Sequence, residues 1–167
     1  SHGRFDVGFA RAFLPHEFAR FGISVNESRD RFTEGMEQVR RLLEEENVTC
    51  EGRFHSFKNT TSLPRPTQKP RPPFWVAALA TPKTFVDAGK AGHSIMAIPM
   101  TVKTMKPLLD LYRDAWRAAG HPGRGRVMLA FHMFCHERRE TAWEIAREPL
   151  NRYLHSVVEA SSDWLTG

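Results

Sequence analysis

Short, continuously apolar runs alternate along the chain with longer segments whose apolar residues recur every three or four positions. The runs predict buried strands, and the three-to-four spacing predicts amphipathic helices. Predicted strands cover Arg4–Phe9, Phe74–Leu79, Ser94–Pro99 and Arg126–Phe134, and the predicted helices lie near Glu27–Glu46, from Thr81 to Gly89 or Gly92, near Thr104–Ala119 and near Arg138–Ala160. Because the strands are apolar throughout and separated by helices, the pattern indicates an α/β fold with a parallel sheet covered by helices.

One segment interrupts this alternation. Residues Val48–Phe57 alternate around Glu51 and Gly52, which predicts a small β-hairpin outside the main sheet, and the proline-rich stretch Pro64–Pro73 predicts a loop. The remainder forms four βα units. Four units fit either an open doubly wound sheet or half of a closed (β/α)8 barrel, and periodicity does not decide between the two.

A helix-start signal supports the first long helix, because Ser24 and Glu27 form a capping-box pattern before it. Pro149 predicts a kink inside the last helix.

Composition narrows the class of protein. The chain has 167 residues, a length that predicts one domain spanning residues 1–167. Its net charge is +5. Its Lys and Arg are scattered among Glu, which argues against a nucleic-acid surface, and no apolar run is long enough to cross a membrane. The two cysteines, Cys50 and Cys135, lack a paired spacing and are typical of reduced thiols in a cytoplasmic protein. Because the chain starts in a strand pattern without Met, we expect a processed product or part of a longer protein.

Arg11 follows the first strand inside an apolar setting. In both candidate architectures, ligands bind at the carboxyl edge of the strands. Burying a guanidinium without an anion is costly, and a phosphate would satisfy its fork with two parallel hydrogen bonds. The alternative is an ion pair with a nearby carboxylate such as Glu17.

Thr81 stands in a similar position after the second apolar strand. It is a plausible N-cap with Pro82 at the first helical position, and helix N-termini bind phosphate through their free N–H groups. Thr84 supplies a second hydroxyl and Lys83 a positive charge; plain capping without a ligand is the alternative. Arg11 and Thr81 would share one sheet edge, which together favours an anionic, phosphate-bearing ligand.

Other polar residues carry weaker hypotheses. In a strand, His132 and His136 would share a face while Cys135 points away, and without a third ligand they predict core histidines rather than a metal site. His16 and Glu17 could perform acid–base work. The sequence contains no GxGxxG, Walker-A or GxSxG motif.

The order of these segments resembles the bacterial luciferase-like flavin monooxygenase family. The resemblance rests on "GRFDVGFARAFLPHEFARFGIS", "SRDRFTEGMEQVRRLL", "CEGRFHSF" and "LPRPTQKPRPPFWVAALATPKTFVDAGKAG", and continues more weakly to the C-terminus. It implies a (β/α)8 barrel of the luciferase-like type, of which this chain would be roughly the middle half: four βα units plus the hairpin excursion.

The resemblance also implies roles for particular residues. Arg11 would approach the FMN phosphate, and Ala10 would lie near the reactive part of the flavin ring, where luciferase has a cysteine. Backbone groups of Ala78, Leu79 and Ala80 and the Thr81 hydroxyl would belong to the phosphate loop, although luciferase has a Glu-Ser pair at Ala78-Leu79. Ile98 and Pro99 would border the ring or the substrate pocket. The family's catalytic histidine lies upstream, so the catalytic residue is unknown here.

The implied reaction is oxygenation of an organic, apolar substrate by reduced FMN and O2. A separate flavin reductase would supply the reduced FMN, and a homodimer is compatible with the family. Three alternatives stay open: a non-catalytic flavin-binding relative, an oxidoreductase that uses the deazaflavin F420 for hydride transfer, and a basic interaction module without a cofactor.

Overall fold

The computed structural model describes residues 2–12, 14–99 and 102–162. The chain divides into two compact units, one made of Ser1–Arg11 and Arg29–Phe131, the other of Ala12–Ser28 and His132–Gly167. The first, larger unit contains the main sheet and its helices. The prediction of a single domain over residues 1–167 stays a prediction.

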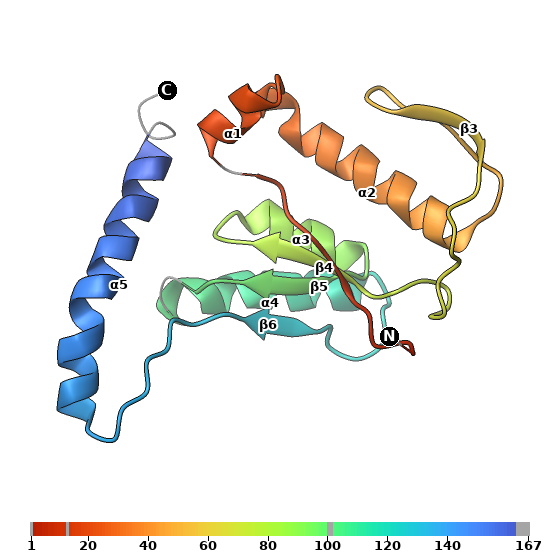
Figure 1. The fold of residues 1–167 in the computed structure, drawn as a ribbon. Coiled ribbons are helices and arrows are strands. Elements are labelled where there is room, and N and C mark those ends of the chain that lie inside the picture. Colours follow the sequence, from red (N-terminus) through yellow and green to blue (C-terminus); the bar gives the residue numbers. More distant parts are fainter. Residues whose placement is uncertain (1, 13, 100–101, 163–167) are drawn as a thin grey trace. The chain divides into compact units, whose positions relative to one another are not determined.

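The larger unit is built on a four-stranded parallel sheet (Figure 1). Its strands, in spatial order, are β1 (Val7–Phe9), β4 (Phe74–Ala78), β5 (Ser94–Ala97) and β6 (Val127–Leu129). Each strand pairs with the next strand of the sheet along the chain, without the reversal of order that defines a doubly wound sheet. This order is that of a barrel arc, so the topology decides what periodicity left open.

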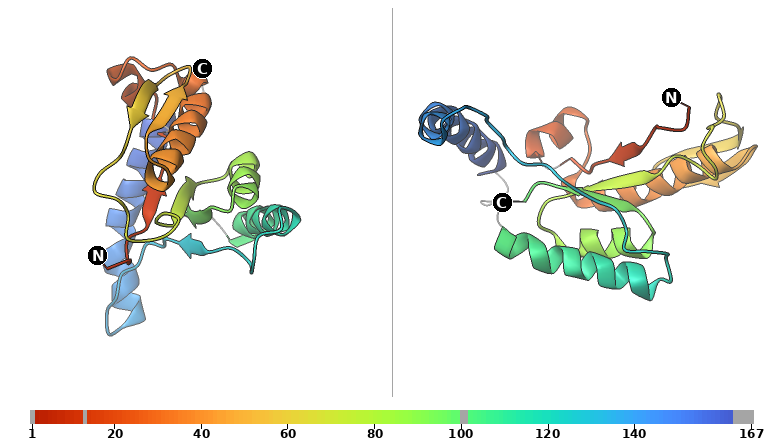
Figure 2. Two further views of the ribbon diagram at one scale, coloured as in Figure 1. Left: turned by 90° about the vertical axis from the view of Figure 1, so that its right-hand side faces the viewer. Right: turned by 90° about the horizontal axis from the view of Figure 1, so that it is seen from below.

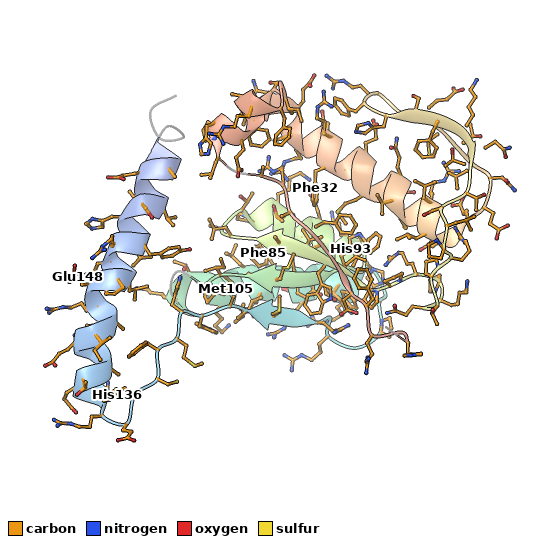
Figure 3. The ribbon with its side chains drawn as sticks, in the orientation of Figure 1. Phe32, Phe85, His93, Met105, His136 and Glu148 are labelled. Atoms are coloured by element: carbon orange, nitrogen blue, oxygen red, sulfur yellow. The ribbon has the colours of Figure 1, made fainter. Side chains whose placement is uncertain are left out.

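Alternation along the strands creates the core. In β4, Phe74, Val76 and Ala78 are buried, while Trp75 and Ala77 point to the opposite face. The buried set packs against the helices α2 (Ser28–Glu44), α3 (Pro82–Lys90) and α4 (Val102–Ala118). The other buried residues of this core are Ile95 and Ala97 of β5 and, on the helices, Met36, Phe85, Ala88, Met105, Leu108 and Tyr112. Figure 2 shows α3 and α4 lying side by side, and Figure 3 labels Phe85 and Met105 in this layer.

A polar cluster connects the outer strands across the other face of the sheet. The Trp75 indole Nε1 donates a hydrogen bond to the Asp6 carboxylate at 2.8 Å, and Arg126 lies 3.1 Å from the same carboxylate. The Arg126 guanidinium also stacks on the Trp75 ring, 4.7 Å from its centroid. Asp6 precedes β1 and Arg126 precedes β6, so this contact over two intervening strands indicates a sheet curled toward that face, as in a barrel.

Small residues on this second face make room for a methionine. A Cβ added at Gly8 of β1 would lie 2.9 Å from the Met96 Cε of β5. The Met96 side chain therefore crosses the intervening strand and packs on Gly8, which explains why glycine occupies the middle of a strand.

The predicted hairpin is confirmed. Strands β2 (Val48–Glu51) and β3 (Ser56–Thr60) pair antiparallel. The turn is held by Glu34 of α2, whose carboxylate accepts hydrogen bonds from the backbone N–H groups of Arg53, Phe54 and His55 at 2.8–3.0 Å. Burial opposes the charge of Glu34, but these donors lower the pKa of its carboxyl.

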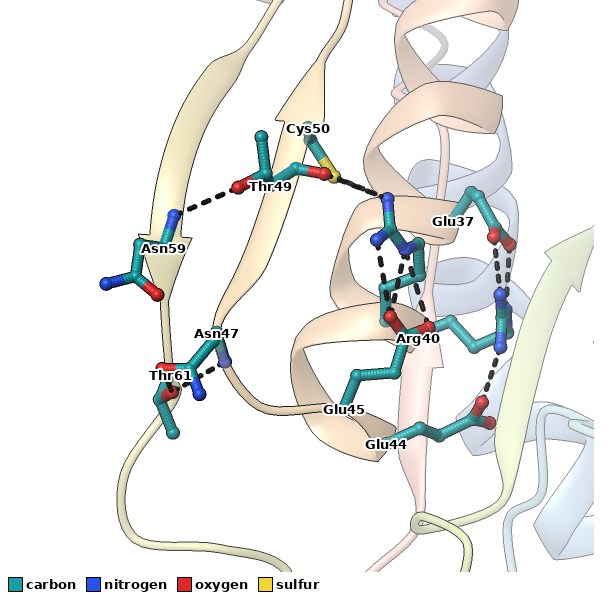
Figure 4. Close-up of polar contacts among 10 residues, drawn as sticks. Glu37, Arg40, Glu44, Glu45, Asn47, Thr49, Cys50, Asn59 and Thr61 are labelled. Atoms are coloured by element: carbon teal, nitrogen blue, oxygen red, sulfur yellow. Dashed lines mark hydrogen bonds and ion pairs between the residues drawn. The ribbon is translucent and has the colours of Figure 1, made fainter.

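Figure 4 shows how ion pairs along α2 extend toward this hairpin. Arg40 bonds Glu37 at 2.8 Å and also Glu44, while Arg41 donates to the Thr49 carbonyl at 3.1 Å and lies 3.2 Å from the Cys50 Sγ. The network ties the hairpin to α2 rather than to the main sheet.

Three local predictions are wrong. The strand predicted over Arg126–Phe134 ends at Leu129, because its partner β5 ends at Ala97, and the last backbone bond runs from Ala130 N–H to the Ala97 carbonyl. His132 and His136 therefore do not lie in a strand, and both are exposed. The capping box also fails, because Val25–Glu27 form a short 3-10 turn and the Ser24 side chain makes no cap bond.

The smaller unit contains two helices of very different length. Helix α1 (Pro15–Arg20) follows Leu14, and α5 (Arg139–Ser162) contains Pro149. The His132 ring packs on Tyr153 of α5 with centroids 5.0 Å apart, while the His136 Nδ1 accepts the Arg138 N–H at 3.1 Å. These contacts are structural. None of the helices in the described ranges is both long and apolar enough to cross a membrane.

His93, just before β5, makes the stability of the larger unit depend on pH. Figure 3 labels His93. Its ring centroid lies 5.7 Å from that of Phe74, and the Arg71 guanidinium lies over the Phe74 ring, 4.0 Å from its centroid. Burial, and then the charge of Arg71, lower the pKa of His93 from 6.5 to about 4. The imidazole is thus neutral in the folded protein at pH values where an unfolded histidine is charged.

We expect the free energy of unfolding to fall as pH drops from about 6.5 toward about 4, because the unfolded state takes up the proton first. The share from His93 should be about 2 kcal/mol after allowance for its partial exposure. Urea unfolding at several pH values checks this. The His93→Gln variant should lose that part of the pH dependence, whereas His55→Gln, at an exposed position, should retain it; identical pH profiles for all three proteins would contradict the assignment.

Candidate functional site

The residues to which the family resemblance gives a cofactor or substrate role lie at the carboxyl ends of three neighbouring strands. Ala10 and Arg11 follow β1, Leu79–Thr81 follow β4, and Ile98 and Pro99 follow β5. The register aligns these strand ends, since Phe9 pairs with Val76 and Ala78 with Ala97. Parallel pairing therefore brings three separate segments of the sequence to one edge, as expected from the fold class.

Ala78 contributes differently from the others. Its side chain is buried in the core, and its backbone pairs with Ala97 in the sheet. Leu79, Ala80 and Thr81 are exposed beyond the end of the strand. Backbone groups for a ligand thus come most readily from residues 79–81.

Arg11 is half-buried at this edge, and a second arginine lies near it. Burial lowers the pKa of the Arg11 guanidinium, and the positive charge of Arg29 lowers it further. The charges of Arg11 and Arg29 therefore act on each other, which brings a second guanidinium into the neighbourhood of the predicted phosphate ligand. The predicted ion pair between Arg11 and Glu17 joins residues of different units and stays a prediction.

Arg29 was not predicted as a site residue, although its place at the start of a helix could have drawn attention to it. It is the second residue of α2, in the first turn of the helix. The helix dipole makes the N-terminal turn unfavourable for a cation, so an arginine there calls for a compensating negative charge. Its spacing from Arg11 in the sequence gives no hint that the two come together.

The start of α3 is arranged as predicted, with one difference. Thr81 is the N-cap and Pro82 occupies the first turn, but the Thr81 side chain makes no capping hydrogen bond. The hydroxyl is exposed and is not used by the helix, which removes the argument for plain capping. Lys83 contributes less charge than expected, because its Nζ pairs with Asp87 at 2.8 Å.

Apolar side chains border the same edge. Leu79 is 50% exposed and Ile98 is 45% exposed, although both are large aliphatic residues. Side chains of this kind can exclude water from a ligand that lies across the strand ends.

Acid–base and metal chemistry receive no support from the geometry. His16 is exposed and Glu17 is half-buried, both on the short helix α1, so their acid–base role stays a hypothesis. Among the residues that the structure describes, no group of three or more His, Cys, Asp or Glu side chains is arranged to hold a metal ion.

Because the Thr81 hydroxyl makes no cap bond, Thr81→Ala should change the free energy of unfolding by less than about 0.5 kcal/mol, as for an ordinary surface site. A working N-cap would cost about 1 kcal/mol. Thermal or urea unfolding of the unliganded protein measures the difference. Lys58→Ala, at another exposed site, is a control for surface substitution, and a loss near the larger figure for Thr81→Ala alone would show that the hydroxyl caps α3 in solution.

The chain is similar in sequence to a known protein family and to curated proteins. The family model described as luciferase-like monooxygenase matches residues 1–164. The oxygenase component of the flavin-dependent trigonelline monooxygenase of Acinetobacter baylyi is 28% identical over 152 residues, which cover 89% of this chain and 42% of that protein.

Two solved structures share the fold. Monooxygenase RslO1 from Streptomyces bottropensis is 41% identical, with a TM-score of 0.87 over 99% of this chain and 51% of its own. The oxygenating constituent of 3,6-diketocamphane monooxygenase of Pseudomonas putida, solved with FMN, is 18% identical, with a TM-score of 0.77 over 96% of this chain and 50% of its own. The chain thus spans about half the length of these proteins, and the prediction of half a luciferase-like (β/α)8 barrel is confirmed.

Proposed function

Because the chain belongs to the luciferase-like monooxygenase family, we propose that it forms the phosphate-binding half of a flavin-dependent monooxygenase. The protein would use reduced FMN and O2 to oxygenate an organic substrate. One observation carries this proposal: Arg11, with Arg29 close enough to act on its charge, follows β1, and an unused hydroxyl at a helix N-terminus follows the neighbouring strand β4.

These groups fit the phosphate of FMN. Arg11 and Arg29 supply two guanidinium groups, each able to donate paired hydrogen bonds to phosphate oxygens, and the anion would relieve their mutual repulsion. Thr81 supplies a hydroxyl, and the first turn of α3 supplies N–H groups with a favourable dipole. Leu79 and Ala80 add backbone groups from the preceding loop.

The neighbouring residues suit the flavin ring. Ala10 is small and lies next to Arg11, so it allows close approach of a planar ring at the end of β1. Ile98 and Pro99 at the end of β5 would border the ring or the substrate, and Leu79 and Ile98 would exclude water. When bound, the reduced flavin supplies the electrons for O2 activation, and this chain binds and orients it.

Other parts of the reaction are assigned to groups outside this chain. The relative from Acinetobacter baylyi is named as an oxygenase component, which supports a separate reductase as the source of reduced FMN. From the family resemblance we infer that the catalytic histidine would belong to a part of the protein upstream of β1.

Arg11→Ala and Arg29→Ala should each weaken FMN binding by about 1.5–3 kcal/mol, the range for hydrogen bonds to a charged group, and leave riboflavin binding unchanged. Because both side chains would act on one phosphate, the double variant should lose less than the sum of the single losses. Calorimetric titration of the intact protein with FMN, riboflavin and F420 measures these affinities. Arg117→Ala, on the exposed side of α4, is the matched control.

Each ligand tests a different part of the proposal. Equal affinity for FMN and riboflavin would remove the phosphate site, and tighter binding of F420 would replace oxygenation by hydride transfer. Thr81→Ala should reduce FMN affinity by about 1 kcal/mol, near the value of an ordinary hydrogen bond, without affecting riboflavin.

A further inference from the structure

The turn that ends helix α1 builds an apolar recess. Gly22 has a φ of +62°, and the carbonyl groups left free at the helix end are satisfied by two backbone bonds, Gly22 N–H to Ala19 at 3.1 Å and Ile23 N–H to Phe18 at 3.0 Å. This pair of bonds defines a Schellman motif, which brings the residue after the glycine back onto the last turn of the helix. In this chain it brings Ile23 toward Phe18.

The walls of the recess are almost entirely apolar. It has a volume of about 250 Å³ and is lined by Ala12, Glu17, Phe18, Phe21 and Ile23, all within the smaller unit. Phe18 is buried at 7% exposure, so it forms the floor, whereas Phe21 is 79% exposed. A phenyl ring left so open beside an apolar floor offers a face for another ring.

Glu17 is the polar exception in this lining. Within the described residues of its own unit, 12, 14–28 and 132–162, no hydrogen bond or ion pair of the Glu17 carboxylate is found. A carboxylate beside apolar walls accepts a hydrogen bond from an O–H or N–H group, and it repels anions.

The chain itself fixes how close the recess lies to the proposed flavin site. Ala12 lines the recess and directly follows Arg11, so their Cα atoms are about 3.8 Å apart however the two units are placed. The chain therefore leads directly from a residue that we assign to FMN into the lining of the recess.

We propose that this recess binds the terminal ring of the substrate, and that the ring is apolar and carries one hydroxyl or N–H group donated to Glu17. The inference rests on the proposed function and adds the substrate class to it. An engineered cavity of about 150 Å³ accepts benzene, so this recess of about 250 Å³ has room for one substituted ring. Phe21 would cover the ring, and Ile23 and Ala12 would form its sides.

The test uses 4-methylphenol as the probe and toluene as the same ring without the donor. In protein with labelled methyl groups, 4-methylphenol should shift the Ile23 and Ala12 methyl signals in a saturable manner and leave Ile95, which is fully buried in the other unit, unchanged. Phe21→Ala should weaken binding of both probes at least fivefold. Glu17→Gln should weaken 4-methylphenol by a similar factor and leave toluene unchanged.

Matched controls separate recess binding from general effects. Phe5→Ala removes another exposed ring elsewhere, and Glu140→Gln removes a carboxylate from the first turn of another helix. Neither should change the affinity for either probe. Phe21→Leu preserves apolar volume without the aromatic face, and circular dichroism establishes that each variant is folded.

The outcomes distinguish this inference from the proposed function. Saturable, Glu17-dependent shifts at Ile23 with intact FMN binding support both. FMN binding without probe shifts at Ile23 and Ala12, or equal effects of the control variants, would overturn the recess and leave the flavin site standing. Probe binding in a protein that binds no FMN would overturn the substrate assignment, since no reactive group would then adjoin the ring.

Discussion

Parallel pairing of four strands that are consecutive within the sheet is the constraint on which the rest of this structure depends. It requires a long connection after each strand, and the helices of those connections cover one face of the sheet. It also places every strand end at the same edge. The residues after β1, β4 and β5 come together for this reason alone, although about 70 residues of hairpin, helix and loop separate the first two segments.

The two faces of the sheet serve different purposes. Phe74, Val76 and Ala78 bury apolar surface against the helices, which supplies most of the stability. The opposite face carries Trp75, Met96 and the pair of Asp6 and Arg126, which links the outer strands. The core and the polar cluster thus lie along the strands, whereas the proposed site lies beyond their carboxyl ends.

Charge is placed where local structure disfavours it. Arg29 occupies the positive end of a helix dipole, and Arg11 lies half-buried near it. Burial and the charge of Arg29 both disfavour the charged form of Arg11, and the helix dipole disfavours a cation at Arg29. A phosphate would compensate both, and the Thr81 hydroxyl, which its own helix does not use, would add to its binding.

The sequence by itself determined most of the strands and long helices, the α/β class and the hairpin, because hydrophobic periodicity acts locally, but it did not predict the short helix α1. Tertiary structure decided the rest. The last strand ends at Leu129 because a strand extends only as far as its neighbour pairs with it, whatever its own apolar pattern predicts. Arg29 comes close enough to Arg11 to act on its charge, although nothing in their spacing along the sequence indicates this. The strand order that identifies half a barrel is likewise a property of pairing, not of any single strand.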